Sequence, residues 1–201
     1  MFDRRVYEAP ATEVAPLLLG AYLTHGEVTV RLTEVEAYLG EVDPGSHAFR
    51  GLTPRTTVMF GEPGHLYAYF TYGMHVCINV VCSPAGVASA VLLRAGEVID
   101  GIEIARMRRT TARIDRDLAR GPARLTVALG IPLAANGSDL GRAPFALELQ
   151  QPVAEFATGP RNGVSGPGGS TDFPWRFWIP GDPTVSPYKP GVVRSRGAAS
   201  L

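Results

Sequence analysis

Two carboxylates two residues apart, Glu34 and Glu36, are the side chains of this chain whose type and spacing point most directly to chemistry. They follow a stretch whose alternate residues are apolar, namely Val28, Val30 and Leu32. Because alternate residues of a β-strand share a face, the same period places Glu34, Glu36 and Tyr38 on the buried side. A buried carboxylate is costly unless it is paired or used. A β-bulge, or a strand that passes from core to solvent, would explain the same pattern without a site.

Arg94 and Asn79 are polar residues inside apolar segments. Arg94 ends the run AVLL, and an arginine that leaves a buried strand is expected to meet a carboxylate. Glu36 is a candidate partner, and such a pair would keep the carboxylate ionised and could hold a water beside it. Asn79 lies within VCINVVC, so its amide is expected to hydrogen-bond either to the backbone or to a ligand.

Three tyrosines cluster within six residues: Tyr67, Tyr69 and Tyr72. Tyr67 and Tyr69 share a face of one expected strand, and we expect Tyr67 to pack in the sheet. Tyr72 precedes Gly73 at an expected hairpin turn, where a large aromatic ring has little core to enter. Exposed aromatic tips act as wedges between bases or as binding anchors.

The elements that must position these residues are predicted from periodicity and from Gly and Pro. Helices are expected over 12–23 (with Thr12 as N-cap), 97–109 and 120–131, and strands over 27–39, 87–95 and 174–181, with two more around a turn within 65–82. A long loop is expected over 40–64. Strands that follow one another with few helices between them predict an α+β fold with a curved, mostly antiparallel sheet and flanking helices. We expect a single domain over 1–190, and flexibility in 163–174 and in the tail 191–201.

Composition limits the class of protein. The chain has 201 residues, 45% of them hydrophobic, which suits one globular domain. Its sequence has no apolar run of membrane-spanning length, and its start, MFDRRVYEAP, lacks the apolar core of a signal peptide. We therefore expect a cytoplasmic protein, nucleoid-associated if bacterial. Cys77 and Cys82 are expected on opposite faces of one strand, buried and reduced rather than bridged.

The charge is balanced overall but uneven along the chain. The formal net charge is zero, yet seven arginines fall within residues 106–124. Arginine suits phosphate recognition, so this segment could contact nucleic acid. It could equally be a solvated helix surface whose arginines pair with nearby acids, for which the candidates are Glu103, Asp115 and Asp117.

Several chemistries lose support because their motifs are missing from the sequence. The chain contains no HExxH, no zinc-deaminase pattern, no GxxxxGK[ST], no GxGxxG and no GxSxG. The four histidines and two cysteines do not have the spacing of a metal site. We therefore predict no metal ligands and no cofactor.

A family resemblance rests on long motifs in order. These are EVEAYLG, a histidine nine residues after Tyr38, TPR, MFG-PGHLY-Y-TYGM, Asn79, LLRA and GPARL. From about Leu17 to Val185 the chain resembles the alkyladenine (3-methyladenine) DNA glycosylase family. The resemblance implies a monofunctional, cofactor-free repair enzyme that flips damaged purines out of duplex DNA and hydrolyses their N-glycosidic bond, leaving an abasic site. It also implies a fold similar to the C-terminal domain of formyltransferases.

The resemblance assigns roles within the pocket residue by residue. Glu36 matches the general base, and Arg94 matches the arginine that helps to hold the attacking water. Three residues match those that enclose the flipped base: Tyr38, His47 and Tyr69. Asn79 matches a residue that disfavours the 2-amino group of normal guanine. Glu34 is the less favoured base, although spacing alone does not separate it from Glu36.

Other matches concern the DNA. Tyr72 matches the tyrosine that enters the duplex and fills the vacated space. Gly121 and Pro122, with Arg124, match a segment near the DNA backbone. Thr56 departs from the family pattern, which usually has Asn after TPR. The expected partner is double-stranded DNA with damaged purines, bound by a monomer without membrane contact.

Two other functions remain open at this point. A non-catalytic nucleic-acid-binding module could use the same arginines and tyrosines, although it would not need an acid facing DNA phosphate. A glycosidase could use Glu34 and Glu36 as a pair, although neighbours on one strand face would struggle to flank opposite sides of a sugar. The lesion is also open among 3-methyladenine, 7-methylguanine, hypoxanthine and etheno-adenine.

Overall fold

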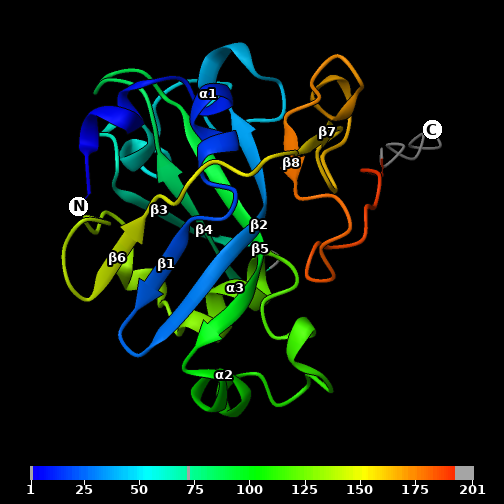
Figure 1. The fold of residues 1–201 in the computed structure, drawn as a ribbon. Helices are drawn as coiled ribbons and strands as arrows, with labels where there is room; N and C mark the ends of the chain where they lie inside the picture. The colour runs from blue at the N-terminus through cyan, green and yellow to red at the C-terminus, as the bar shows by residue number, and fades with distance from the viewer. Residues whose placement is uncertain (1, 72, 193–201) are drawn as a thin grey trace, which may run out of the picture.

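A curved antiparallel sheet is the frame of the protein (Figure 1), shown here by a computed structural model that describes residues 2–71 and 73–192. Within these ranges there are three α-helices: α1 (Ala11–Leu17), α2 (Ile102–Arg108) and α3 (Pro122–Leu129). The same ranges hold eight strands: β1 (Tyr22–His25), β2 (Val28–Tyr38), β3 (Leu66–Thr71), β4 (His75–Val81), β5 (Ala90–Asp100), β6 (Phe145–Glu148), β7 (Ala157–Gly159) and β8 (Arg176–Trp178).

The sheet has the order β3-β4-β5-β2-β1-β6, and β8 pairs with both β2 and β7. Every pairing between these strands is antiparallel. The predicted α+β class with a mostly antiparallel sheet is therefore confirmed, while the likeness to the formyltransferase domain stays a prediction. The two longest strands, β2 and β5, lie side by side at the centre, so residues that they carry are held firmly.

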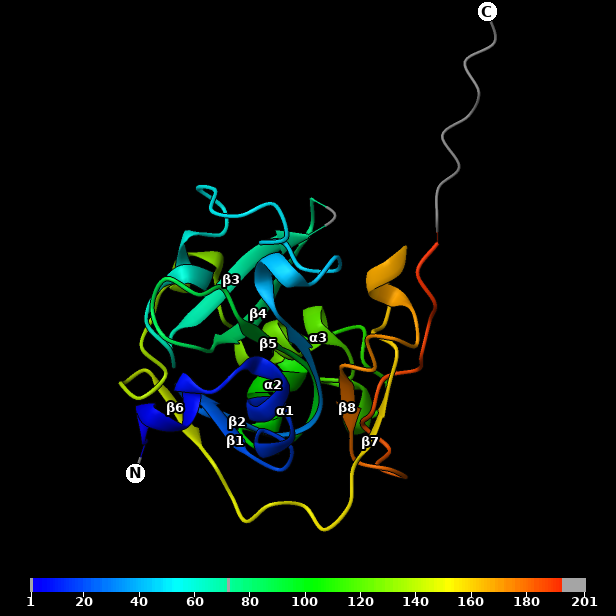
Figure 2. The same ribbon diagram turned by 90° about the horizontal axis from the view of Figure 1, so that it is seen from above.

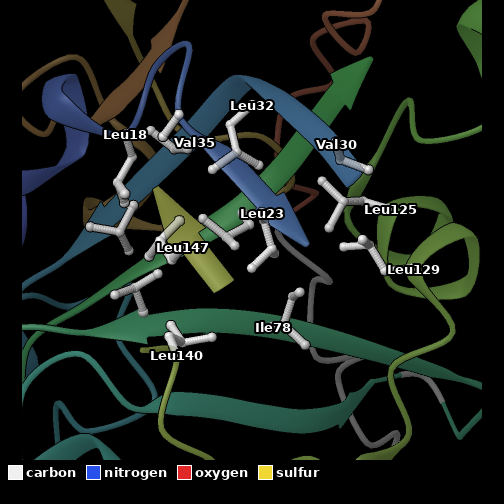
Figure 3. Close-up of a cluster of buried hydrophobic side chains, with 14 of the residues drawn as sticks. Leu18, Leu23, Val30, Leu32, Val35, Ile78, Leu125, Leu129, Leu140 and Leu147 are labelled. Atoms are coloured by element: carbon white, nitrogen blue, oxygen red, sulfur yellow. The ribbon is translucent and has the colours of Figure 1, made fainter. Parts of the chain in front are cut away.

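One apolar core lies between the sheet and the helices (Figure 3). Val30 of β2 lies beside Leu125 and Leu129 of α3, Leu32 belongs to the same core, and Leu18 after α1 lies near Val35. All of these side chains are buried. Burying a leucine or valine contributes about 1.5–3 kcal/mol each, so this face fixes the sheet against the helices. The opposite face of β2, β3, β4 and β5 is thereby left for a site.

The alternation predicted along β2 is wrong beyond Leu32. The pairing of β2 with β5 has register shifts between Leu32 and Glu34 and between Glu34 and Val35. Val35, rather than Glu34, is the next residue to join the core that contains Leu32. The irregularity therefore moves Glu34 and Glu36 to the opposite face of the sheet, as a bulge is expected to do. Both acids are nevertheless fully buried.

A glycine of β5 permits the close approach of β2 and β5 at this point. A Cβ on Gly96 would lie 2.4 Å from the carbonyl oxygen of Arg31 and from Cγ1 of Val30. No side chain larger than hydrogen fits there unless β2 moves away. Gly96 pairs with Leu32, immediately before the register shift. The close approach of the strands and the change of phase are therefore neighbouring features.

Two predicted helices need correction. The first helix ends at Leu17 rather than residue 23, because β1 begins at Tyr22, and its N-cap is Pro10 rather than Thr12. The helix expected from residue 97 starts at Ile102, since β5 continues to Asp100. The remaining helix, the long strand 27–39 and the hairpin within 65–82 agree with α3, β2, β3 and β4. Strands β1, β6 and β7 were not predicted.

The two cysteines lie on opposite faces, as expected, and both are free and buried. Cys82 belongs to the apolar core, whereas Cys77 lines a pocket on the other face. No helix of the described residues is long and apolar enough to cross a membrane. Most of the predicted tail, residues 193–201, lies outside the part of the chain that the structure describes.

Candidate active site

A pocket of about 570 Å³ opens on the face of the sheet opposite the core. The loop after β2, the β3–β4 hairpin and the segment around residues 161–169 lie on the same side of the molecule (Figure 2). All three contribute to the pocket wall, together with the start of α3. Its lining includes Tyr38, Gly45, His47, Tyr67, Tyr69, Cys77, Asn79, Leu92, Arg94, Gly121, Pro122, Arg124 and Asn162.

A single cross-strand row explains why the sequence brings distant residues together here. Tyr67 pairs with Asn79, Asn79 pairs with Leu92, and Leu92 pairs with Glu36. Arg176 of β8 pairs with Glu36 on its other side. Residues in register on one face of a sheet lie about 5 Å apart from strand to strand. The acid and the aromatic pocket are therefore placed by the strand register.

Glu36 lies directly behind the pocket and is fully buried. Its Oε2 accepts a hydrogen bond from the Tyr38 hydroxyl at 2.9 Å and one from an Arg94 guanidinium nitrogen at 3.4 Å. Its Oε1 accepts the backbone N–H of Asn162 at 2.6 Å. These three partners all line the pocket. Among the residues that the structure describes, Glu36 itself does not belong to that lining. The carboxylate thus lies beneath a thin polar layer formed by its own donors.

Glu34 has a different environment, in which both oxygens are occupied. Oε1 accepts from Nε of Arg94 at 3.0 Å and from Nε of Arg176 at 2.7 Å, and Oε2 accepts from the backbone N–H of Ser186 at 2.7 Å. Burial raises the pKa of Glu34, but the charges of Arg94 and Arg176 and the Ser186 hydrogen bond outweigh it, so the pKa lies below its usual value. Glu34 is therefore an ionised structural partner and not a free acid, which disfavours the paired-carboxylate glycosidase.

Arg94 connects the two acids. The sequence predicted that it would meet a carboxylate, and it contacts both Glu34 and Glu36, with a longer hydrogen bond of 3.4 Å to Oγ of Ser186. Burial opposes its charge, but Glu36 and then Glu34 hold its pKa above the ordinary arginine value. Arg94 therefore stays a cation, and one of its nitrogens lies between the pocket and Glu36.

Aromatic rings form one wall of the pocket. The ring of His47 meets Tyr69 edge-on with 4.5 Å between centroids, and Tyr69 stacks on Tyr67 at 5.6 Å. Tyr67 is almost fully buried and packs against Met59, so its predicted packing role is confirmed, although it also lines the pocket. Tyr38 completes the enclosure from β2. The structure brings Tyr38, His47 and Tyr69 together as the sequence predicted.

His47 carries one proton in this environment. Its Nε2 lies 3.3 Å from a guanidinium nitrogen of Arg55, which can only donate, and its Nδ1 lies 3.3 Å from the Tyr67 hydroxyl. The proton therefore belongs on Nδ1. Part of the side chain is exposed at the pocket mouth, yet burial and then the charge of Arg55 lower the pKa of His47 to about 4. The ring is neutral at physiological pH.

Asn79 is held by the backbone, which was one of the two expected outcomes. Its amide nitrogen donates to the carbonyl of Tyr67 at 3.0 Å, and the residue is almost fully buried at the pocket wall. One amide N–H is thus engaged, which leaves the second N–H and the side-chain oxygen for a ligand. Thr56, the departure from the family pattern, closes the TPR turn through hydrogen bonds of its Oγ1 to the backbone N–H and the hydroxyl of Thr53, both 2.9 Å.

The predicted DNA-facing residues divide into three groups. Tyr72 lies outside the described residues, although its neighbours Phe70 and Met74 are exposed. Gly121 and Arg124, at the start of α3, line the pocket, and Arg124 is exposed. Of the arginine-rich segment, Arg106 pairs with Glu103 and Asp115, and Arg120 pairs with Asp117. The interpretation that these arginines pair with nearby acids is therefore correct for Arg106 and Arg120.

Sequence reasoning missed five residues that shape the site: Asp43, Arg161, Asn162, Arg176 and Ser186. Asn162 and Ser186 act through backbone N–H groups, which leave no mark on residue type. Arg161 and Asp43 form a fully buried ion pair, with one oxygen–nitrogen distance of 2.6 Å. Their segments are loops rich in Gly and Pro, where periodicity carries no signal. For this pair, the sequence shows only the short stretch GPRNG (159–163) around Arg161.

Within residues 2–71 and 73–192, no three side chains of His, Cys, Asp or Glu come together as a metal site. Cationic, aromatic and acidic groups instead meet around one concave surface. Such a pocket, with a buried carboxylate behind stacked aromatic rings, defines a candidate hydrolytic site for a flat ligand.

Comparison with known proteins agrees with this site. The methylpurine-DNA glycosylase family model matches residues 5–183, so the chain belongs to that family. It is an enzyme, a DNA glycosylase that hydrolyses N-glycosyl bonds in DNA. Relatives that are provisionally named 3-methyladenine DNA glycosylases cover nearly all of it. The protein of Leifsonia xyli is 63% identical over 92% of each chain, and that of Streptomyces avermitilis is 54% identical over 96% of this chain and 94% of its own.

Proposed function

We propose that the protein excises alkylated purines, such as 3-methyladenine, from duplex DNA with a water molecule activated by Glu36. The observation that carries this proposal is the position of Glu36, a fully buried carboxylate with three donors, directly behind an aromatic pocket. The names of the relatives support the lesion class. The product would be an abasic site and the free base.

Glu36 would act as general base. Attack at the anomeric carbon of the deoxyribose requires a positioned water and a carboxylate that accepts its proton. The water oxygen forms the new bond to carbon, its proton passes to Glu36, and the electrons of the breaking C–N bond go to the purine. The developing positive charge on the sugar is also stabilised by the nearby carboxylate. Arg94, 3.4 Å from Oε2, would hold the water beside Glu36.

The leaving group would need little assistance. A purine methylated at N3 or N7 is cationic, and it becomes neutral when the bond breaks. Tyr38 and Tyr69 would stack on such a cation, a preference of about 1–2 kcal/mol when desolvated. His47, with its pKa lowered to about 4, adds no competing positive charge at neutral pH. The pocket therefore suits a cationic purine better than a sound one.

Reaching the base would require flipping. A damaged base costs less to unstack than a sound one, which adds selectivity. Tyr72 would fill the vacated space in the duplex, and Arg124 with the backbone at Gly121 would contact phosphate beside the pocket mouth. Asn79, one of whose amide N–H groups is engaged by the Tyr67 carbonyl, would occupy the space beside the purine edge and so oppose the extra 2-amino group of guanine sterically. Hypoxanthine and etheno-adenine remain candidate lesions.

Release of free base from methylated duplex DNA tests the proposal, with wild type beside Glu36→Gln in the presence of EDTA. Glu97→Gln, an exposed acid of β5, is the matched control. We expect 3-methyladenine from wild type and Glu97→Gln, and a loss of roughly 100-fold or more for Glu36→Gln. Equal release by Glu36→Gln would move the base elsewhere. No release by any variant, with DNA binding retained, would support a binding module instead.

A further inference from the structure

Arg161 is the largest fully buried side chain among the described residues. It lies in a loop and pairs with Asp43, which belongs to another loop and is also fully buried. Charged side chains are rarely buried to this degree unless paired, and a buried ion pair is not in itself a strong source of stability. A pair of this kind beside an active site therefore calls for a role other than stability.

The guanidinium of Arg161 fastens several segments that meet behind the pocket. One terminal nitrogen donates to the carbonyl of Ala37 in β2 at 3.0 Å, and the other donates to the carbonyl of Gly168 at 2.8 Å. The carboxylate of Asp43 accepts hydrogen bonds from both terminal nitrogens of Arg161. It also accepts one from the backbone N–H of Gly45 at 2.8 Å. The end of β2, the loop after it and the segment 161–169 are thus fixed to one another.

The same guanidinium lies against aromatic rings. Its central carbon is 4.4 Å from the centre of the Tyr38 ring and 5.2 Å from that of Trp175. Its Nε has no hydrogen-bond partner among the residues that the structure describes. Tyr38 lines the pocket, so Arg161 supports that ring from behind.

The pocket wall at Gly45 is set by the same pair. A Cβ on Gly45 would lie 2.4 Å from a terminal nitrogen of Arg161. Gly45 lines the pocket, and its backbone N–H is held by Asp43. The buried ion pair is therefore separated from the pocket at this point only by the backbone of one glycine.

We propose that Arg161 and Asp43 form a positioning pair that holds Glu36 in its working orientation. Two of the donors to Glu36 depend on it. The Tyr38 hydroxyl, which binds Oε2, belongs to the ring that Arg161 supports, and the N–H that binds Oε1 belongs to Asn162, the next residue of the chain. The inference rests on the proposed role of Glu36 as base.

Lysine cannot replace Arg161 in this role. Its single ammonium group lacks the planar fork that matches both oxygens of a carboxylate. The contacts to Ala37 and Gly168 diverge from two different nitrogens, so one nitrogen would not reach both carbonyls and Asp43 together. Arg161→Lys therefore keeps the positive charge but removes the hydrogen bonds that join the segments. The variant thus separates the effect of geometry from the effect of charge.

The experiment measures the single-turnover rate of 3-methyladenine release at saturating enzyme, and separately the Kd for a duplex with a stable abasic-site analogue. For Arg161→Lys and Asp43→Asn we expect the rate to fall roughly 10- to 100-fold, as for displaced catalytic groups. The Kd should change less than about 3-fold, since DNA contacts are made elsewhere. A wild-type rate in a folded Arg161→Lys protein would overturn the inference.

A double variant, Arg161→Met with Asp43→Leu, separates positioning from stability. Replacing both charges by apolar groups often preserves stability, whereas removing one leaves a buried charge unpaired. We expect the double variant to melt at a higher temperature than either single variant, Arg161→Met or Asp43→Leu, yet to remain slow. Recovery of rate together with stability would show that the pair is only structural and would overturn the inference.

Arg4→Lys is the matched control, because Arg4 also forms an ion pair across distant segments, with Asp139 at 2.8 Å, outside the pocket. It should lose some stability and keep its rate. Wild type and Glu36→Gln, assayed alongside, separate a failure of the positioning role from a failure of the proposed function. If Glu36→Gln is inactive while the Arg161 variants are normal, only the positioning role fails; if Glu36→Gln is active, the proposed function fails first.

Discussion

The Tyr38 hydroxyl donates a 2.9 Å hydrogen bond to Oε2 of Glu36, although the two residues belong to the same strand, two positions apart. Both side chains leave the same face of β2, so the tyrosine lies over the acid and lines the pocket in front of it. Burial, and then the charge of Glu36, raise the pKa of Tyr38 far above its usual value. The hydroxyl therefore remains a donor, and one residue both contacts the ligand space and holds the acid.

Tyr38→Phe tests this double role because it removes the hydroxyl and keeps the ring. A hydrogen bond to a charged group contributes about 1.5–3 kcal/mol, so the single-turnover rate should fall roughly 10-fold or more. Binding of lesion-containing duplex should change little, since stacking is retained. Tyr38→Leu, the companion variant, should lose both rate and affinity. Equal losses of affinity in the two variants would contradict the assignment.

Glu34→Gln should lower stability more than it lowers lesion binding. Arg94 and Arg176 would each lose a buried counter-charge, which costs roughly 3–5 kcal/mol. Urea unfolding with the exposed Glu97→Gln as control measures the difference. A Glu34→Gln protein as stable as the control would show that the two arginines find other partners.

The acid side of the stability curve should also depend on Glu34. Its pKa is lowered in the folded protein, so its contribution is present above the unfolded value near 4.5 and is lost as the pH falls through the folded value. Unfolding free energies measured from pH 7 to pH 3 should therefore fall less steeply below pH 4.5 for Glu34→Gln than for wild type. Parallel curves would contradict the linkage.

His47 should titrate near pH 4, and Arg55→Gln should raise that pKa towards 6.5 because it removes a nearby positive charge. Between these values the unfolded chain binds a proton that the native protein does not. The stabilising contribution is thus complete above about pH 6.5 and is lost as the pH falls towards 4. NMR titration of the imidazole measures both proteins, and an ordinary value in wild type would refute the neutral ring.

Arg124→Ala should weaken DNA binding by similar factors for damaged and undamaged duplexes. A phosphate contact carries no sequence information, and its loss should reduce the slope of log K against log salt by about 1. Arg106→Ala is the comparison, since Arg106 is already paired with Glu103 and Asp115 and should change the slope less. Titrations at several salt concentrations decide between them. A larger change of slope for Arg106→Ala than for Arg124→Ala would place the DNA against α2 rather than against the start of α3.

The sequence predicted most of the strands that carry the site, because β2, β3, β4 and β5 have strong apolar or alternating patterns. The sequence also indicated, through the family resemblance, that Glu36, Tyr69 and Asn79 belong to one site; Tyr69 and Asn79 line the pocket, and Glu36 lies behind it. The sequence could not predict the face of the sheet on which Glu34 and Glu36 lie. Strict alternation puts both acids on the core side, and a register shift that depends on the partner strand reverses this result.

The rest of the site comes from loops and from backbone groups. Asn162 reaches Glu36 through its N–H, and any non-proline residue has such a group, so its identity carries no signal. Arg161 is one arginine among eighteen, and only three-dimensional structure separates it from those at the surface. The long-range contacts of a Gly-rich segment are set by closure around other elements, which local propensity does not encode.

The register shift in β2 means that strand pairing, and not only residue type, determines which side chains face the candidate site. If β2 alternated regularly beyond Leu32, Val35 would face the pocket, and Glu34 and Glu36 would face the core, away from their present partners. Every side chain of the candidate site would still be present in the sequence. A comparison of motifs would then find EVEAYLG intact in a chain whose acids face the wrong side of the sheet, so the irregular pairing between Leu32 and Val35 is itself a requirement for this arrangement.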